Sequence, residues 1–244
     1  MKIALVQLSS VKGTLEHNIR RHLAAVRAFA PGDVDLLMFP ELSLTSYEPE
    51  IAQSAAIAPD DPRLDRFQAA ADRGACSIFV GAPTCSAGRP FISLIGFTPG
   101  RPRTTVQKSH LHPDELAYFS APVPDAYVLE GSSKVALAIC YEISIDAHIA
   151  RAAEKGMDVY LASVAKTVSG IEAASARLQV KAKDFRVPVL VANCVGICEG
   201  KVAGGSSLAI SAHGEVAGRL GASEEAALVY DLDTGTTVRI AIPT

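Results

Sequence analysis

The sequence predicts an α/β protein in which two similar halves share one system of β-sheets. Short apolar runs, typical of buried strands, alternate with segments whose apolar residues recur at the spacing of a helix face. The order strand, helix, strand, helix, strand, strand occurs twice along the chain. Because no low-complexity or charge-block segment separates the two copies, we expect a single domain over residues 1–244.

The first half begins with an apolar strand at residues 2–8. A helix is expected at residues 15–29, because apolar residues recur there at intervals of four and three positions. The elements expected after it are strands at 35–39, 76–81, 91–97 and 104–106, and a helix at 62–73. Gly, Pro and Ser between the strands at 76–81 and 91–97 are typical of a hairpin.

The second half repeats this order. Its expected strands lie at 134–139, 159–163 and 188–192, and its helices at 143–155 and 171–186. Two further strands, at 207–211 and 226–230, complete a β-rich ending. Alternation of strands with helical segments is typical of parallel sheets.

Composition narrows the classes of function. Hydrophobic residues make up 49% of the 244 residues and charged residues 20%, which is enough for a sizeable core and excludes a disordered chain. The net charge of −3 leaves no basic field for a nucleic acid or an anionic membrane. The first apolar run is too short for a signal peptide, and no stretch reaches the roughly 18 apolar residues of a membrane span. We therefore expect a cytoplasmic protein with no nucleic-acid or membrane partner.

The five cysteines are an odd number without regular spacing, so no disulfide framework is expected. Cys194 and Cys198 lack the second pair that a zinc site of this kind needs. His110 and His112 alternate as two ligands on a strand would, but no third ligand is evident. We expect neither a metal nor a cofactor.

Cys140 directly follows the apolar run 134–139, so its thiol lies where a predicted strand ends. Open α/β folds bind ligands at this carboxyl edge of the sheet. A thiolate is a strong nucleophile, but near neutral pH it needs a base or a positive charge beside it. The question is which residues supply them.

Two residues are candidates for these roles. Glu41 follows another apolar strand and Pro40, which places a possible general base at the same edge. Lys108 follows the strand-like 104–106 and is a candidate to stabilise an oxyanion or to lower the thiol pKa. The residues alone leave other interpretations open: both charges solvated at the surface, or the thiol paired with one of the nearby histidines.

Three motifs taken together resemble the carbon–nitrogen hydrolase family, also called the nitrilase superfamily. They are Phe39-Pro40-Glu41, Lys108-Ser109-His110-Leu111 and Cys140-Tyr141-Glu142. Their order matches, as do the separations of 67 residues between positions 41 and 108 and of 32 between 108 and 140. Residues 3–8, 177–193 and 205–215 resemble further family segments, so the likeness covers most of the chain.

The resemblance implies a four-layer α-β-β-α sandwich with two pseudo-symmetric halves and a cofactor-independent hydrolase acting on a small-molecule amide. It also implies roles: Glu41 as general base, Cys140 as nucleophile, and Lys108 with the backbone N–H of Tyr141 as stabilisers of the tetrahedral intermediate. Glu115 matches an additional glutamate of the amidase members, where it would orient the substrate nitrogen or assist proton transfer to the leaving amine.

Two segments are expected to border the substrate pocket. One contains Tyr47; the other is the loop after strand 159–163, with the candidates Ser163, Val164, Ala165 and Lys166. Family members often carry an arginine at the position of Ser144, so the substrate of a relative cannot be transferred to this chain. Members commonly pair through helices beside the active site, and we expect a homodimer or a higher homo-oligomer.

Glu115 and the short chain favour an amidase over a true nitrilase. An N-carbamoyl (ureido) amidohydrolase and a nitrilase remain alternative reactions, and a catalytically silent binding protein on the same fold is the alternative of another class. A glutamine-amidotransferase-like Cys–His enzyme is disfavoured, because Ile139 and Tyr141 rather than glycines flank the thiol.

Overall fold

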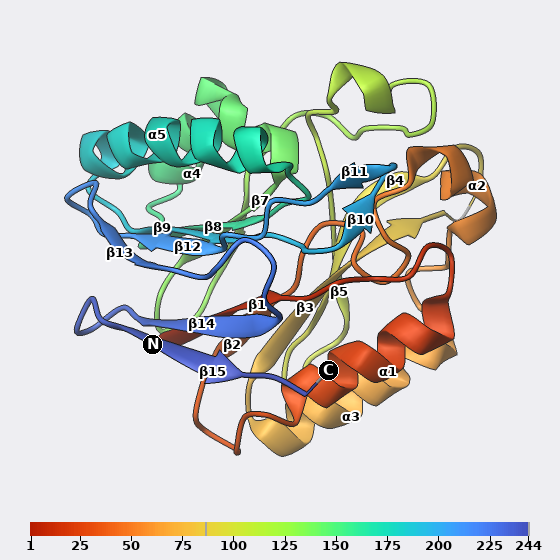
Figure 1. The fold of residues 1–244 in the computed structure, drawn as a ribbon, viewed down its shortest axis with the longest axis horizontal. Helices are drawn as coiled ribbons and strands as arrows, with labels where there is room; N and C mark the ends of the chain where they lie inside the picture. Colours follow the sequence, from red (N-terminus) through yellow and green to blue (C-terminus); the bar gives the residue numbers. More distant parts are fainter. Residues whose placement is uncertain (86, 244) are drawn as a thin grey trace.

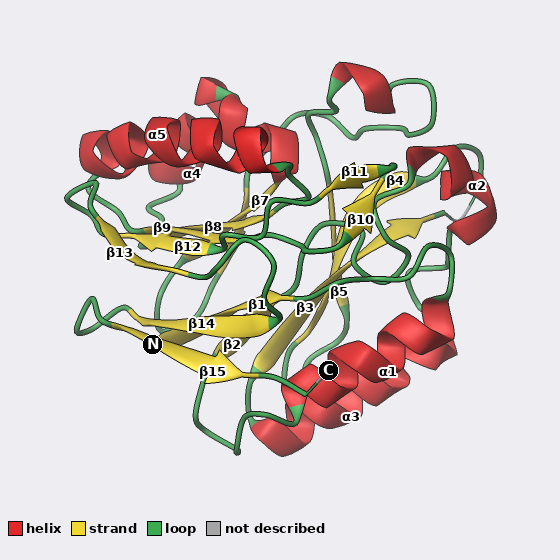
Figure 2. Cartoon of the chain, in the orientation of Figure 1, coloured by secondary structure: helices red, strands yellow, loops and turns green. Residues whose placement is uncertain are grey.

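Four layers of secondary structure stack on one another in the computed structural model, which describes residues 1–85 and 87–243. Helices α1 (Leu15–Val26) and α3 (Asp65–Gly74) cover the outer face of one sheet, and α4 (Asp146–Glu154) and α5 (Val168–Phe185) cover the outer face of the other (Figure 1). Figure 2 shows the two sheets between these helix layers. The predicted α-β-β-α sandwich is confirmed.

The first sheet has seven strands in the order β15-β14-β1-β2-β3-β4-β5. Strands β1, β2 and β3 are parallel, and the other neighbours pair antiparallel. The strands are β1 (Lys2–Gln7), β2 (Leu36–Met38), β3 (Ser77–Thr84), β4 (Phe91–Phe97), β5 (Thr104–Gln107), β14 (Ala226–Asp231) and β15 (Thr237–Ala241).

The second sheet has six strands in the order β13-β12-β9-β8-β7-β6. Strands β7, β8 and β9 are parallel, and β12 then pairs antiparallel with β9, as β4 does with β3 in the first sheet. The strands are β6 (Tyr127–Leu129), β7 (Val135–Ile139), β8 (Val159–Ser163), β9 (Val189–Ala192), β12 (Leu208–Ile210) and β13 (Val216–Arg219). This correspondence is the predicted pseudo-symmetry of the two halves.

Three apolar clusters hold the layers together. The central one lies between the sheets and joins Leu5 and Phe79 of the first sheet to Leu137 and Leu161 of the second. The other two clusters pack each sheet against its own pair of helices. Each central strand is therefore buried on both faces, which explains its continuous apolar sequence.

The helix predicted at 143–155 begins later than expected. A 3₁₀ turn, η4 (Cys140–Ser144), comes first, and Ile145 is extended before α4 starts at Asp146. The apolar residues of 143–155 have the spacing of one helix, although the backbone leaves the helical conformation at Ile145. Further 3₁₀ turns are η1 (Pro49–Ile51), η2 (Pro62–Leu64) and η3 (Pro113–Glu115).

The sequence patterns did not indicate the short helix α2 (Ala52–Ala55) or strands β6, β13 and β15. They also missed the hairpin of β10 (Ile197–Cys198) and β11 (Lys201–Val202), which lies outside both sheets (Figure 1). Its turn residues Glu199 and Gly200 have φ of 50° and 70°, as a two-residue hairpin turn requires. Within the described residues, no helix is both long and apolar enough to cross a membrane.

Candidate active site

Three strands end around one group of buried polar side chains. Glu41 follows β2, Lys108 follows β5 and Cys140 follows β7. Parallel strands direct their carboxyl ends to the same edge of a sheet, and the face-to-face packing of the sheets brings the two edges together. The three residues predicted from the strand ends are therefore neighbours, although they lie far apart in the sequence.

The turn that carries Glu41 passes very close to strand β3. A Cβ atom on Gly81 would lie 2.3 Å from the backbone nitrogen of Leu42 and 2.6 Å from the carbonyl oxygen of Pro40. Only glycine leaves room for this approach. The hydroxyl of Ser163 donates a 2.8 Å hydrogen bond to the carbonyl oxygen of Phe39, so the start of the turn is also tied to the second sheet.

Lys108 is fully buried and lies between two carboxylates. Its Nζ donates to Glu41 Oε1 at 2.8 Å and to Glu115 Oε1 at 2.6 Å. Burial by itself lowers the pKa of the ammonium, but the charges of Glu41 and Glu115 and the hydrogen bond to Glu115 oppose this effect, and the pKa is raised. Lys108 therefore keeps its positive charge in the interior.

Glu115 is held by donors from three directions. Besides Lys108, the hydroxyl of Tyr47 donates to Oε1 at 2.8 Å and the backbone N–H of His112 donates to Oε2 at 2.7 Å. Burial raises the pKa of Tyr47, so its hydroxyl keeps its proton and remains a donor. Each oxygen of Glu115 is occupied, which fixes the carboxylate and through it the ammonium of Lys108.

Cys140 has φ of 43°, a left-handed backbone conformation that costs energy for a residue with a Cβ. It is also the first residue of η4, where N–H groups have no carbonyl partner within the turn. Burial and the charge of Glu41 raise the pKa of the thiol to about 12, against the opposing effects of Lys166 and Lys108. The resting thiol is therefore protonated near neutral pH and needs a base.

Glu41 has the properties of such a base. Burial raises its pKa to about 7, although the charge of Lys108 opposes the shift. Its Oε2 atom is buried and accepts no hydrogen bond from the part of the chain that the structure describes. A carboxylate with a pKa near neutrality and a free oxygen is well suited to general-base catalysis.

Glu142 is a structural residue of the site whose role the sequence patterns did not reveal. Its Oε2 accepts the N–H of Ile139 at 2.8 Å, and its Oε1 accepts both the N–H and the hydroxyl of Ser109 at 2.7 Å. Ser109 follows Lys108, and Ile139 precedes Cys140. This one buried carboxylate therefore joins the loop after β5, which carries Lys108, to the 3₁₀ turn η4, which carries Cys140. A glutamate at the third position of a helical turn, as in a capping box, is the sequence feature that could have indicated this role.

A pocket of about 230 Å³ opens onto Cys140. The pocket candidates Tyr47, Ala165 and Lys166 line it, as does Glu115. Ser163 and Val164 do not, and this corrects their prediction as pocket residues: Ser163 is the fully buried last residue of β8, and Val164 is fully buried in the apolar cluster between the second sheet and its helices. Tyr141, which the resemblance placed beside the thiol as a backbone donor, also lines it. The sequence patterns missed the other lining residues, His112, Asp114, Thr167, Gly170, Cys198, Glu199, Lys201 and Ala203.

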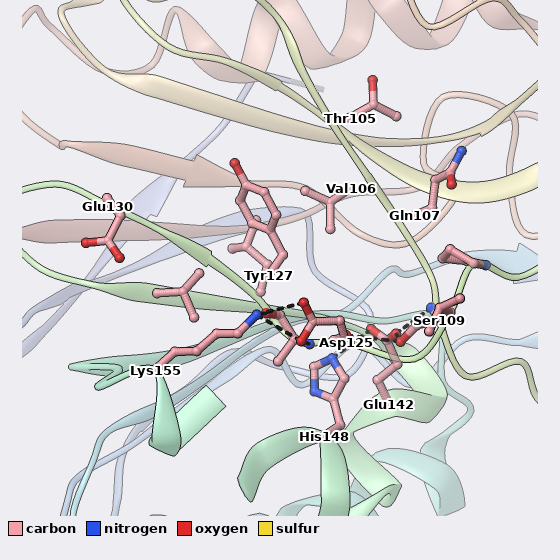
Figure 3. Close-up of a pocket in the computed structure, with 15 residues that line it drawn as sticks. Thr105, Val106, Gln107, Ser109, Asp125, Tyr127, Glu130, Glu142, His148 and Lys155 are labelled. Atoms are coloured by element: carbon pink, nitrogen blue, oxygen red, sulfur yellow. Dashed lines mark hydrogen bonds and ion pairs between the residues drawn. The ribbon is translucent and has the colours of Figure 1, made fainter. Parts of the chain in front are cut away.

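A second cavity, of about 580 Å³, lies next to this site but contains none of Glu41, Lys108 or Cys140 (Figure 3). Glu142 and Ser109 contribute to its wall, as do Lys155 and Asp125, which form an ion pair at 2.7 Å. The wall of this cavity therefore includes residues that support the turn bearing Cys140.

Among residues 1–85 and 87–243, no three His, Cys, Asp or Glu side chains are grouped as a metal site requires. His110 Nδ1 lies 3.0 Å from Ser109 Oγ, and His112 Nδ1 lies 3.5 Å from Asp114 Oδ2. The two histidines therefore contact different neighbours.

Known proteins resemble this chain over nearly all of its length. A sequence model of the family described as carbon-nitrogen hydrolase matches residues 2–241. An (R)-stereoselective amidase from Pseudomonas sp. is 29% identical over 96% of this chain and 86% of its own length. A glutamine-dependent NAD(+) synthetase from Thermotoga maritima is 26% identical over 99% of this chain, which spans only 44% of the synthetase.

Two solved structures share the fold. An amidase from Nesterenkonia sp. AN1 superposes with a TM-score of 0.83 at 24% identity, over 95% of this chain and 92% of the amidase. A protein of the CN-hydrolase superfamily from Xanthomonas campestris reaches 0.85 at 20% identity, over 99% of this chain and 90% of the other.

Proposed function

Because the chain belongs to the carbon–nitrogen hydrolase family, we propose that it hydrolyses a small linear amide through a thioester on Cys140. The chain is a hydrolase of carbon–nitrogen bonds other than peptide bonds, with amidases among its relatives. The observation that carries the proposal is the buried ammonium of Lys108, held 2.8 Å from Glu41 and 2.6 Å from Glu115 beside the thiol.

In the first step Glu41 takes the proton of the thiol while the sulfur of Cys140 attacks the carbonyl carbon. The raised pKa of both groups supports a proton transfer that accompanies attack rather than a thiolate formed beforehand. Negative charge develops on the carbonyl oxygen, where the ammonium of Lys108 and the N–H of Tyr141 stabilise it.

The tetrahedral intermediate then collapses and the carbon–nitrogen bond breaks. Glu41, now carrying the proton, donates it to the leaving nitrogen, so that ammonia or an amine departs and a thioester remains. In the second step Glu41 takes a proton from water, the hydroxide attacks the thioester, and the carboxylic acid leaves as the proton returns to the sulfur of Cys140.

Glu115 acts mainly by holding Lys108 in place. Both of its oxygens already accept hydrogen bonds, from Lys108, Tyr47 and the backbone of His112. A carboxylate oxygen has a second acceptor position, and Oε2 can use it to orient the nitrogen of the substrate. This role agrees with an amide, whose nitrogen carries protons to donate, better than with a nitrile.

The test is release of ammonia from a panel of small amides, ureido acids and nitriles, since a pocket of about 230 Å³ suits a small acyl group. Glutamine belongs in the panel because glutamine-dependent NAD(+) synthetases match nearly the whole of this chain. We expect turnover of at least one amide by the wild type and none by Cys140→Ala.

Each other outcome points to a different function. Turnover confined to ureido acids or nitriles would replace the amide by the corresponding alternative substrate. Equal turnover by Cys140→Ala would refute the thioester. Binding of amides without turnover, measured by calorimetry, would favour the catalytically silent binding protein.

Two further expectations belong to this proposal. We expect residues 1–244 to unfold in one cooperative transition, as a single domain does. We also expect the chain to form a homodimer or a higher homo-oligomer, which light scattering coupled to size-exclusion chromatography would detect.

A further inference from the structure

Two cysteines outside the reacting group meet at the wall of the substrate pocket. The sulfur atoms of Cys194 and Cys198 lie 3.6 Å apart. Cys194 is buried just beyond β9, whereas Cys198 is half-buried on β10 and lines the pocket together with Cys140. Thiols this close need only a small movement to reach the S–S bond length of about 2.05 Å.

Cys198 also contacts the segment that positions Tyr47. The hydroxyl of Ser46 donates to the sulfur of Cys198 at 3.8 Å, and a hydrogen bond from the backbone of Tyr47 stabilises the negative charge of that sulfur. The hydroxyl of the same tyrosine donates to Glu115. A chain of contacts therefore runs from Cys198 through Tyr47 to the carboxylate that holds Lys108.

The two thiols differ in their acidity. The hydrogen bond from Cys194 and those from the Ser46–Tyr47 segment lower the pKa of Cys198 to about 7 against the effect of burial. The same thiol–thiol hydrogen bond, together with burial, raises the pKa of Cys194. Near neutral pH, Cys198 is thus the member of the pair that ionises to a thiolate. Cys194 stays protonated and donates a hydrogen bond to it.

From this geometry we propose that Cys194 and Cys198 form a redox-active dithiol, which a peroxide converts to a disulfide. The disulfide weakens the hydrogen bonds between Cys198 and the Ser46–Tyr47 segment, and so the positioning of Tyr47. The thiolate of Cys198 attacks one oxygen of hydrogen peroxide, the O–O bond breaks, and a sulfenic acid forms as hydroxide leaves and takes a proton to become water. The sulfur of Cys194 then attacks the sulfenic sulfur, and the S–S bond forms as a second water leaves.

The disulfide changes the contacts of Cys198 more than those of Cys194. Cys194 is packed in the interior with 4% of its surface exposed, so Cys198 makes most of the movement of about 1.5 Å that closes the bond. A disulfide sulfur is also a weaker acceptor than a thiolate, so the hydrogen bonds from Ser46 and Tyr47 weaken. If the proposed amidase reaction is correct, we expect kcat/KM to fall about 3- to 10-fold.

Two other thiols, those of Cys76 and Cys140, are poor competitors for peroxide. Burial raises the pKa of Cys76 to about 11 and that of Cys140 to about 12, so both remain protonated near neutral pH. Since the thiolate is the reactive form, Cys198 is expected to react before either of them.

The test uses the reduced chain of residues 1–244, treated with one equivalent of hydrogen peroxide, then with iodoacetamide, and digested with trypsin. Residues 187–201 form one tryptic peptide that contains Cys194 and Cys198 and no other cysteine. We expect this peptide to lose two hydrogens and to carry no label, and dithiothreitol to restore two labelled positions. Two labels on this peptide after Cys140 has been oxidised would overturn the proposal.

Cys194→Ser is the test variant and Cys76→Ser the matched control, because each removes one buried thiol and neither residue lines the pocket. Cys194→Ser should stop at the sulfenic acid, trapped with dimedone, while Cys76→Ser should form the disulfide like the wild type. The peptide map of the wild type decides the dithiol even if a variant fails to fold or no substrate is found. An unchanged kcat/KM after oxidation would overturn the proposed effect of the disulfide on Tyr47 and, through it, on Glu115.

Discussion

Replacement of Gly81 by alanine should displace Glu41, the proposed base, without changing any side chain of the proposed reaction. The added Cβ would lie 2.3 Å from the nitrogen of Leu42, 2.6 Å from the carbonyl oxygen of Pro40 and 2.9 Å from the carbonyl carbon of Glu41. These are backbone atoms, so no side chain can rotate away to relieve the contact.

The size of the effect follows from these distances. Ordinary contact begins at 3.4 Å, so the turn bearing Glu41 must move by about 1 Å from the 2.3 Å approach. A displacement of about 1 Å at a catalytic group costs about 100-fold in rate, which corresponds to about 2.7 kcal/mol. Overpacking should also lower stability by about 1–3 kcal/mol, or about 2–4 °C in Tm for each kcal/mol.

Gly96→Ala is the matched control. Its Cβ would lie 2.4 Å from the ring of Phe79 in the same sheet, so it overpacks the core without contacting the Glu41 turn. Ammonia release should be measured on both variants and the wild type well below their Tm values, which circular dichroism supplies. Gly81→Ala with kcat/KM within about threefold of the wild type, or an equal loss in Gly96→Ala, would refute the reasoning.

Three further predictions concern groups that surround the thiol. Because burial raises the pKa of Glu41 to about 7 and only its ionised form accepts a proton, kcat/KM should rise with pH around a midpoint near 7. Tyr47→Phe removes the 2.8 Å donor to Glu115 and should lower kcat/KM about 3- to 10-fold in the same assay. Glu142→Gln presents its amide N–H₂ group to the N–H of Ile139 or to Ser109, and thermal unfolding should show a loss of about 2–4 kcal/mol.

Separate outcomes would contradict each of these. A pH profile with a midpoint near 4.5, the ordinary value for glutamate, would show that Glu41 is not shifted or is not the base. Full activity in Tyr47→Phe would mean that Lys108 and the backbone N–H of His112 hold Glu115 without the hydroxyl of Tyr47. An unchanged Tm in Glu142→Gln would show that this carboxylate does not join the two loops.

The local patterns of the sequence predicted the fold well where the strands are central. The strands at 91–97 and 159–163 have the predicted bounds, because buried parallel or central strands are apolar throughout and turn residues delimit them. The start of the helix after Cys140 was placed too early, because helical periodicity cannot detect a 3₁₀ turn with one extended residue after it. The edge strands β6, β13 and β15 were missed because their exposed faces carry no continuous apolar signal.

The sequence by itself determined that Glu41, Lys108 and Cys140 follow strands, since a polar residue after an apolar run is a local signal. Only the tertiary structure decided that Glu142 joins two loops and that Ser163 belongs to the core instead of the pocket. Such contacts depend on how two sheets close on each other, and no spacing along the chain encodes that distance.

The same reason separates the two groups of cysteines. Cys140 could be recognised from the strand before it, whereas the 3.6 Å approach of Cys194 to Cys198 depends on the path of the loop and hairpin that follow β9. Their spacing in the sequence suits neither a zinc site nor a disulfide framework, yet the fold places both thiols beside the pocket. The sequence thus indicates the proposed nucleophile, and the packing of distant segments decides what surrounds it.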